Sequence, residues 1–152
     1  HTRNRDGVVS LKDGSPFSRP DIHFHSYVEA NPLADPDLLA LVEGVKFVRQ
    51  VQRNLVDVTA TEVWPGSAQQ SDAQLAAWIR KESWGHHACC TDRMGDVADA
   101  DAVVDSHFRV IGADRLRVVD ASVFPEIPGT FIAMPIFMLS ERAADVIHEA
   151  AR

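Results

Sequence analysis

The sequence predicts a mixed α/β (α+β) fold, because segments of strand-like and of helix-like periodicity both occur. Apolar and polar residues alternate over residues 21–28, whereas apolar residues recur at helical spacing over 36–55 and 134–150. A third observation lies in residues 116–134, where a buried-strand pattern ends in polar residues and leads through a Pro/Gly turn to a helix start. Open α/β sheets bind cofactors at such places, since backbone N–H groups and the helix dipole converge there.

Composition excludes several function classes. The chain has 152 residues, enough for a core, and a formal charge of -7 without a Lys/Arg cluster, which argues against a nucleic-acid partner. No apolar run approaches the roughly 20 residues that span a bilayer, so no membrane partner is expected. The two cysteines, Cys89 and Cys90, are adjacent. Adjacent cysteines rarely pair, so we expect reduced thiols and a cytoplasmic location.

The first predicted element is a half-buried strand over residues 21–28. His23 and His25 share one of its faces and could meet a metal or substrate together, but a solvated or sheet-covering face is the favoured interpretation. A helix follows, with Asp35 as N-cap and Pro36 as its first residue. Its apolar stripe is predicted to support the core and carries no functional information. The stripe comprises Leu38, Leu41, Val42, Val45, Val48, Val51 and Leu55.

Ser71 and Gln74 form a predicted capping box for a second helix, which ends near residues 83–85. The acidic stretch 92–105 is predicted to be a solvated loop, since it lacks the glycine and glutamate of a calcium loop. Residues 108–111 and 116–119 are predicted strands. A last helix, from about Met134 to Ala150, is expected to bury Phe137, Leu139, Ala143, Ala144 and Val146.

Two consecutive histidines, His86 and His87, follow the second helix and a glycine. An imidazole on such a turn can face a cavity and take a proton from a substrate hydroxyl. Consecutive side chains point in different directions, so at most one of them is expected to be the base. Zinc is disfavoured because these histidines and the two cysteines crowd four potential ligands into five positions, with no second pair elsewhere. No metal is therefore expected.

The residues from Gly85 to Ile147 contain short motifs in a fixed order. They are His87 seven residues before Met94-Gly95, with Thr91 and Arg93 between; Ala102 to Asp105; Leu116 to Ser122, ending in Asp-Ala-Ser; Ile127-Pro128-Gly129; and Glu141 to Ile147. In this order and spacing they resemble the carboxyl-terminal portion of the glucose–methanol–choline (GMC) family of flavoprotein oxidoreductases. A looser similarity covers residues 31–54.

The resemblance implies an FAD-dependent oxidoreductase acting on a CH–OH donor, an alcohol oxidase or dehydrogenase. It implies that His87 is the proton acceptor while the hydride passes to flavin N5. Asp120 and Ala121 would lie against the ribityl and diphosphate region of FAD. The backbone of Ile132, Ala133 and Met134 would approach the isoalloxazine ring, where a helix start favours developing negative charge.

Three positions depart from the family pattern. Ala88 stands where a proline usually follows the histidine, and Cys89 and Cys90 fill small positions. The family's second active-site residue, commonly Asn or His, falls at Ala133, which has no hydrogen-bonding side chain. His86, Thr130 or another part of the protein would then supply the second polar contact to the cofactor or substrate.

No glycine fingerprint (GxGxxG) for a dinucleotide occurs in the sequence. The resemblance therefore implies a partner, the N-terminal FAD-binding chain of the same nicked, split or truncated enzyme, and a small hydroxyl-bearing substrate. Residues 1–84 would complete the substrate-binding domain, and residues 85–152 would carry the catalytic histidine and the closing strand and helix of the FAD-binding domain. Two alternatives stay open: a flavin-containing lyase of the same fold, and a non-catalytic binding or assembly module with structural histidines.

Overall fold

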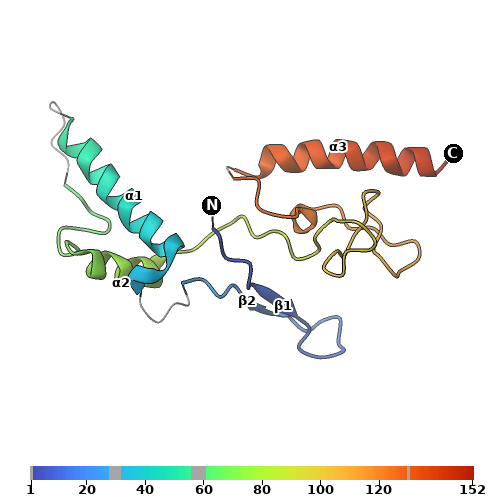
Figure 1. The fold of residues 1–152 in the computed structure, drawn as a ribbon, viewed down its shortest axis with the longest axis horizontal. Coiled ribbons are helices and arrows are strands. Elements are labelled where there is room, and N and C mark those ends of the chain that lie inside the picture. The colour runs from blue at the N-terminus through green and yellow to red at the C-terminus, as the bar shows by residue number, and fades with distance from the viewer. Residues whose placement is uncertain (1, 28–31, 56–60, 130) are drawn as a thin grey trace. The chain divides into compact units, whose positions relative to one another are not determined.

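The computed structural model describes residues 2–27, 32–55, 61–129 and 131–152. The chain divides into two compact units, Thr2–Trp84 and Gly85–Arg152. Helices and a small sheet occur among loops (Figure 1), so the mixed α/β class is confirmed. The assignment of residues 1–84 and 85–152 to a substrate domain and an FAD domain stays a prediction.

The first unit begins with a two-stranded antiparallel sheet. Strand β1 (Val8–Ser10) pairs with β2 (Asp21–His23), and Val9 lies opposite Ile22. The strand predicted over 21–28 is therefore right for its first three residues only. It ends because His25 and Tyr27 have left-handed backbone angles, with φ of 51° and 56°, which interrupt an extended strand. Residue 28 lies outside the described residues.

Two helices form the core of the first unit, after a short 3-10 turn, η1 (Pro32–Ala34). Helix α1 (Pro36–Arg53) starts at the predicted cap, where the Asp35 carboxylate accepts hydrogen bonds from two backbone N–H groups. Helix α2 (Asp72–Glu82) starts with the predicted Ser71–Gln74 capping box. Their shared core consists of Leu38, Val42, Leu75, Ala76 and Ile79. The apolar stripe of α1 is thus buried only near its start, and Val48 is 63% exposed.

The second unit consists of tight turns, the 3-10 turn η2 (Ala121–Val123) and helix α3 (Ala133–Ala150). Its core consists of Val104, Phe108, Val123, Ala143 and Val146. The strands predicted at 108–111 and 116–119 are wrong, because the described residues 108–119 form only isolated bridges, such as Arg109 with Arg117. Phe108, Gly112 and Arg115 all have positive φ, between 60° and 83°, and each bends the chain out of the extended conformation.

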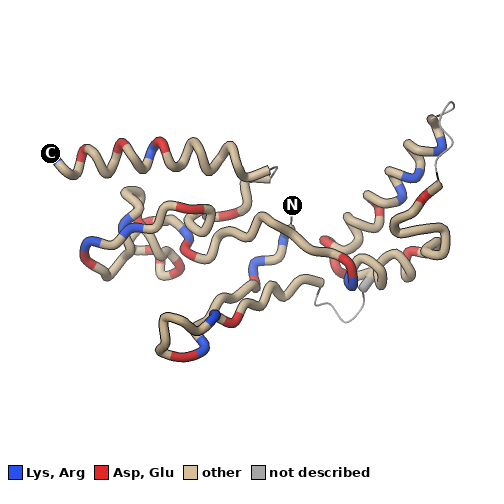
Figure 2. The backbone as a smooth tube through the Cα atoms, turned by 180° about the vertical axis from the view of Figure 1, so that it is seen from behind, with Lys and Arg blue, Asp and Glu red and all other residues tan. Residues whose placement is uncertain are grey.

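Helix α3 begins one residue before the predicted start. Ala143 and Val146 are buried as predicted, and Leu139 packs at the edge of the core. Phe137 and Ala144 are exposed, so their predicted burial is wrong. They lie seven residues apart on a face that the core does not contact. Figure 2 shows that the charged residues of α3 lie in its C-terminal part, which leaves the first turns apolar.

No helix in the described parts of the chain combines the length and the apolar character needed to cross a membrane.

Candidate active site

Backbone hydrogen bonds fix the segment that follows the histidine pair against the turn η2. The N–H groups of Cys90, Asp92 and Met94 donate to the carbonyl oxygens of Ala121, Ser122 and Val123, over 3.2, 3.0 and 2.9 Å. The donors are two residues apart along an extended segment, whereas the acceptors are consecutive residues of the tighter η2 turn, and the three bonds hold the two segments side by side. The chain leaving His87 is therefore held beside the predicted cofactor turn at Asp120 and Ala121.

The turn η2 has its own cap. The Asp120 carboxylate accepts hydrogen bonds from the backbone N–H and the hydroxyl of Ser122. Asp120 is nevertheless exposed, and Ala121 is half-buried. The Asp120 carboxylate thus has a fixed position at the surface of the unit, where remaining oxygen lone pairs can accept hydrogen bonds from a ligand.

His87 contacts the residue that leads into α3. Its imidazole and the Phe131 ring have centroids 5.6 Å apart and planes 86° apart, a T-shaped aromatic pair. His87 is half-buried, whereas His86 is exposed. The two side chains therefore have different environments, as expected for neighbours on a turn, and His87 is the one held against the start of α3.

The start of α3 is suited to an electron-rich group. Ile132, the N-cap, is only 6% exposed, and no described side chain caps the helix. Ala133 and Met134 form the first turn, and Pro135 has no N–H. The N–H groups of this turn and the positive end of the helix dipole therefore point toward the space before the helix. His87, the Asp120 turn and Ile132–Met134 thus belong to the same unit. His87 contacts Phe131, and the segment after His87 is hydrogen-bonded to the turn η2.

Two further residues were predicted for the site, Thr130 and Ala133. Thr130, a candidate substrate contact, lies outside the described residues. Ala133 is the first residue of α3 and offers only a methyl group and its backbone to the site.

The expectation of reduced cysteines is wrong. Cys89 and Cys90 form a disulfide between adjacent residues, and Cys90 has a left-handed backbone with φ of 79°. The positive φ at Cys90 lets the chain turn directly after the bond, where its N–H reaches the carbonyl of Ala121. The argument for a cytoplasmic location from free thiols therefore falls away.

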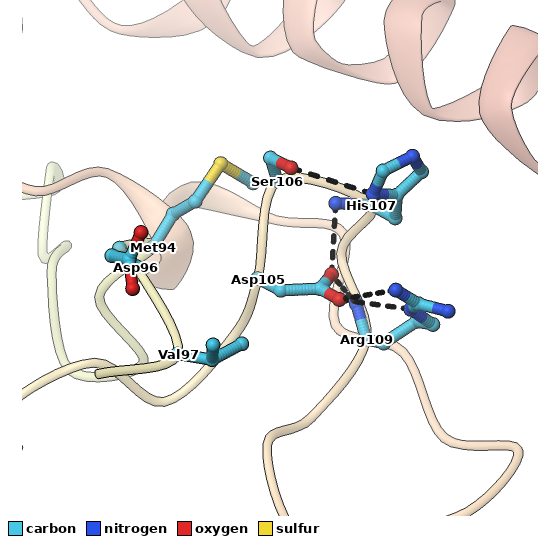
Figure 3. A pocket seen from close by; sticks show the side chains of 8 residues that line it. Met94, Asp96, Val97, Asp105, Ser106, His107 and Arg109 are labelled. Atoms are coloured by element: carbon cyan, nitrogen blue, oxygen red, sulfur yellow. Dashed lines mark hydrogen bonds and ion pairs between the residues drawn. The ribbon is translucent and has the colours of Figure 1, made fainter. Parts of the chain in front are cut away.

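A pocket of about 440 Å³ opens elsewhere in the second unit (Figure 3). Asp105 organises it, because its carboxylate accepts hydrogen bonds from the backbone N–H groups of His107 and Arg109 and from the Arg109 guanidinium. Burial opposes ionisation of Asp105, but these hydrogen bonds prevail and lower its pKa. The described residues that line the pocket are Met94, Gly95, Asp96, Val97, Asp105, Ser106, His107 and Arg109. None of them is a predicted site residue, so we interpret the Asp105 cluster as support for the loop.

Sequence reasoning missed Phe131 as a site residue. Phenylalanine has no hydrogen-bonding group, and its contact with His87 arises from tertiary structure. One signal was available, since Phe131 immediately precedes the residues predicted to approach the flavin. Within the described residues no group of three or more His, Cys, Asp or Glu side chains could hold a metal ion.

Comparisons with known proteins agree with the motif order. The family model for GMC oxidoreductase matches residues 3–140. The oxygen-dependent choline dehydrogenase of Staphylococcus saprophyticus is 34% identical over 148 residues, which are 95% of this chain and 26% of that protein. The mitochondrial choline dehydrogenase of Mus musculus is 35% identical over 144 residues, 93% of this chain and 23% of that one.

A solved structure of a fungal aryl-alcohol oxidase is 33% identical, with a TM-score of 0.73. The match covers 95% of this chain and 23% of the oxidase. The chain thus spans about a quarter of the length of these relatives. The family model covers most of the sequence, and the chain belongs to the GMC oxidoreductase family.

Proposed function

We propose that this chain is the C-terminal part of an FAD-dependent oxidoreductase that acts on the CH–OH group of an alcohol, with His87 as the proton acceptor. The observation that supports the proposal is the contact of His87 with Phe131, the residue immediately before the N-cap of α3. Family membership supports it, as do relatives named choline dehydrogenase and aryl-alcohol oxidase.

The residues around His87 fit a flavin. Ala133 and Met134 begin a helix that no described side chain caps, so their end of the helix dipole can stabilise negative charge on an electron-rich ring. The fixed, exposed Asp120 can accept hydrogen bonds from ribityl hydroxyls, with Ala121 next to it. FAD, when bound, accepts the substrate hydride at N5. An N-terminal FAD-binding part of the enzyme would hold the rest of the nucleotide.

His87 has a defined task in this proposal. A ring nitrogen in the neutral imidazole accepts a hydrogen bond from the substrate hydroxyl and then its proton, which leaves the carbinol carbon able to release a hydride. The T-shaped contact with Phe131 restricts rotation of the imidazole. The side chain of Ala133 cannot make a second polar contact, so His86, Thr130 or another part of the protein would supply it.

The test is anaerobic reduction of the bound flavin in the complete enzyme. His87→Ala should leave the yellow flavin bound but slow its reduction by an alcohol about a hundredfold or more, the usual contribution of a general base. His107→Ala is the matched control, since His107 is exposed in the same unit and lines the separate pocket. Unchanged reduction in His87→Ala would remove His87 from the mechanism. Turnover without flavin reduction in the unaltered enzyme would instead indicate a lyase.

A further inference from the structure

Phe131 is unusual among the site residues, because it is large, apolar and 78% exposed, yet one part of its ring already contacts His87. We propose that Phe131 is a specificity-determining residue whose ring packs against a flat, unsaturated group on the alcohol, so the preferred substrates are uncharged aryl alcohols. This inference rests on the proposed role of His87 as the base.

The imidazole of His87 and the ring of Phe131 are close enough to contact the same substrate molecule. A substrate hydroxyl that hydrogen-bonds to a ring nitrogen of His87 lies roughly 2.8 Å from that nitrogen. The carbinol carbon and its substituent extend a few ångströms further, while the Phe131 centroid is 5.6 Å from the imidazole centroid. A ring attached to the carbinol carbon can therefore reach the 4.5–7 Å centroid separation at which aromatic pairs attract each other.

The chemistry of the neighbouring residues carries the second step. Phe131 is followed by Ile132, Ala133, Met134 and Pro135, so this part of the wall has neither a charge nor a polar side chain. Figure 2 shows the same absence of charged residues over the first turns of α3. An apolar wall favours a neutral substituent. A cationic alcohol would have to gain its attraction from the face of Phe131 alone, because this wall provides no carboxylate.

The exposed ring of Phe131 has surface available for contact with a substrate. A ring that is 78% exposed gains contact when an apolar substituent covers it, and an aromatic substituent adds a favourable edge or stacking geometry. That geometric contribution corresponds to about a three- to tenfold preference for a planar ring over a saturated ring of similar size.

The experiment uses the complete enzyme and a matched pair of substrates, benzyl alcohol and cyclohexylmethanol. Phe131→Leu removes the aromatic ring but keeps apolar bulk, and Phe131→Tyr keeps the ring. Phe137→Leu is the control, because Phe137 is a second exposed phenylalanine, on α3. Retention of the flavin absorbance in each variant shows that the site is still assembled.

We expect Phe131→Leu to lower kcat/KM for benzyl alcohol about three- to tenfold more than for cyclohexylmethanol, mainly through KM. Phe131→Tyr should restore the preference for benzyl alcohol, and Phe137→Leu should leave it unchanged. Equal losses for the two alcohols, or none, would overturn the inference. A larger loss for choline than for benzyl alcohol would also overturn it, in favour of cation binding by the ring.

A binding measurement separates this inference from the proposed function. Benzyl methyl ether has no hydroxyl proton to transfer, so its affinity, measured by calorimetry against cyclohexylmethyl methyl ether, does not depend on the base. Phe131→Leu should weaken the binding of benzyl methyl ether and leave the binding of cyclohexylmethyl methyl ether unchanged. If His87→Ala slows flavin reduction but Phe131→Leu leaves both ethers unchanged, the specificity role is wrong and the proposed function stands. If His87→Ala does not slow flavin reduction while Phe131→Leu weakens binding of the benzyl ether, the ring contact is supported and the base is another residue.

Discussion

Replacing Asp105 should destabilise the loop of residues 105–109, which holds the core residue Phe108. One Asp105 oxygen accepts two backbone hydrogen bonds, from the N–H of His107 at 2.8 Å and from the N–H of Arg109 at 3.0 Å. Between them lies Phe108, which is 2% exposed and has a left-handed backbone with φ of 63°. That conformation costs a non-glycine residue roughly 1–2 kcal/mol, so the two hydrogen bonds hold a conformation that the chain would otherwise avoid.

The magnitude follows from the bonds that each substitution removes. Asp105→Ala loses both backbone hydrogen bonds to a charged acceptor, each of which contributes about 1.5–3 kcal/mol net. The lower end of this range applies here, because His107 and Arg109 are exposed and water can reach their N–H groups. The pair with Arg109 adds at most about 1 kcal/mol, because the arginine is 58% exposed. We expect a loss of about 3 kcal/mol for Asp105→Ala. Asp105→Asn keeps an acceptor oxygen for the backbone and should lose only about 1 kcal/mol.

The assay is amide hydrogen exchange in the complete enzyme, followed at His107 and Arg109. A loss of 3 kcal/mol in local stability accelerates exchange about a hundredfold, and 1 kcal/mol accelerates it about fivefold. Asp114→Ala, a change at an exposed aspartate in the next turn, serves as control. The reasoning is refuted if Asp105→Ala accelerates exchange less than threefold, or if the asparagine variant equals the alanine variant.

Acidification tests the same cluster without a mutation. Burial acts against the charged form, yet the hydrogen bonds from Arg109 and His107 lower the pKa of Asp105 in the folded state. The carboxylate therefore contributes its full stabilisation above the pKa of an unfolded aspartate, about 3.9, and loses it as the pH falls through the lower folded value. Protection of the His107 amide, corrected for intrinsic exchange, should persist at pH 5 and decline below about pH 4.

Three further predictions concern other parts of the chain. Mass spectrometry after alkylation should find no free thiol at Cys89 or Cys90 until a dithiol reductant is added; thiols that react without reductant would exclude the bond. Ser71→Ala should destabilise the start of α2 by about 1 kcal/mol, read as faster amide exchange at Gln74, whereas Ser71→Asp should have little effect. Leu38→Ala should destabilise the first unit by roughly 2–5 kcal/mol, since Leu38 is fully buried, and an effect under 1 kcal/mol would place it outside the core.

Local signals made the helices predictable. Asp35 before Pro36, and Ser71 before Gln74, specify helix starts through hydrogen bonds within a few residues, and both starts are where the sequence placed them. The strand predictions were wrong because Phe108 and Arg115 adopt left-handed conformations. Glycine is the residue that usually marks such a conformation in a sequence, and neither position is a glycine. The predicted burial was partly wrong for α3. Periodicity showed that this helix is apolar, but it did not indicate which apolar face packs against the core.

The site was predictable in part for a similar reason. The order of motifs along the chain made His87 the candidate base, a role that stays a prediction, and the structure holds the segment that follows it beside the Asp120 turn. The contact with Phe131 and the bond between Cys89 and Cys90 depend on three-dimensional placement. Only the position of Phe131, directly before the residues predicted to approach the flavin, pointed to its contact, and residue type did not.

The position of FAD in an experimental structure of the complete enzyme tests the central proposal most directly. The proposal predicts a ring nitrogen of His87 on the flavin N5 side, separated from N5 by the space of one carbinol group, roughly 3–5 Å. The first turn of α3 should then border the isoalloxazine ring. A flavin bound far from His87, with the imidazole facing only protein, would contradict the assignment of His87 as the base.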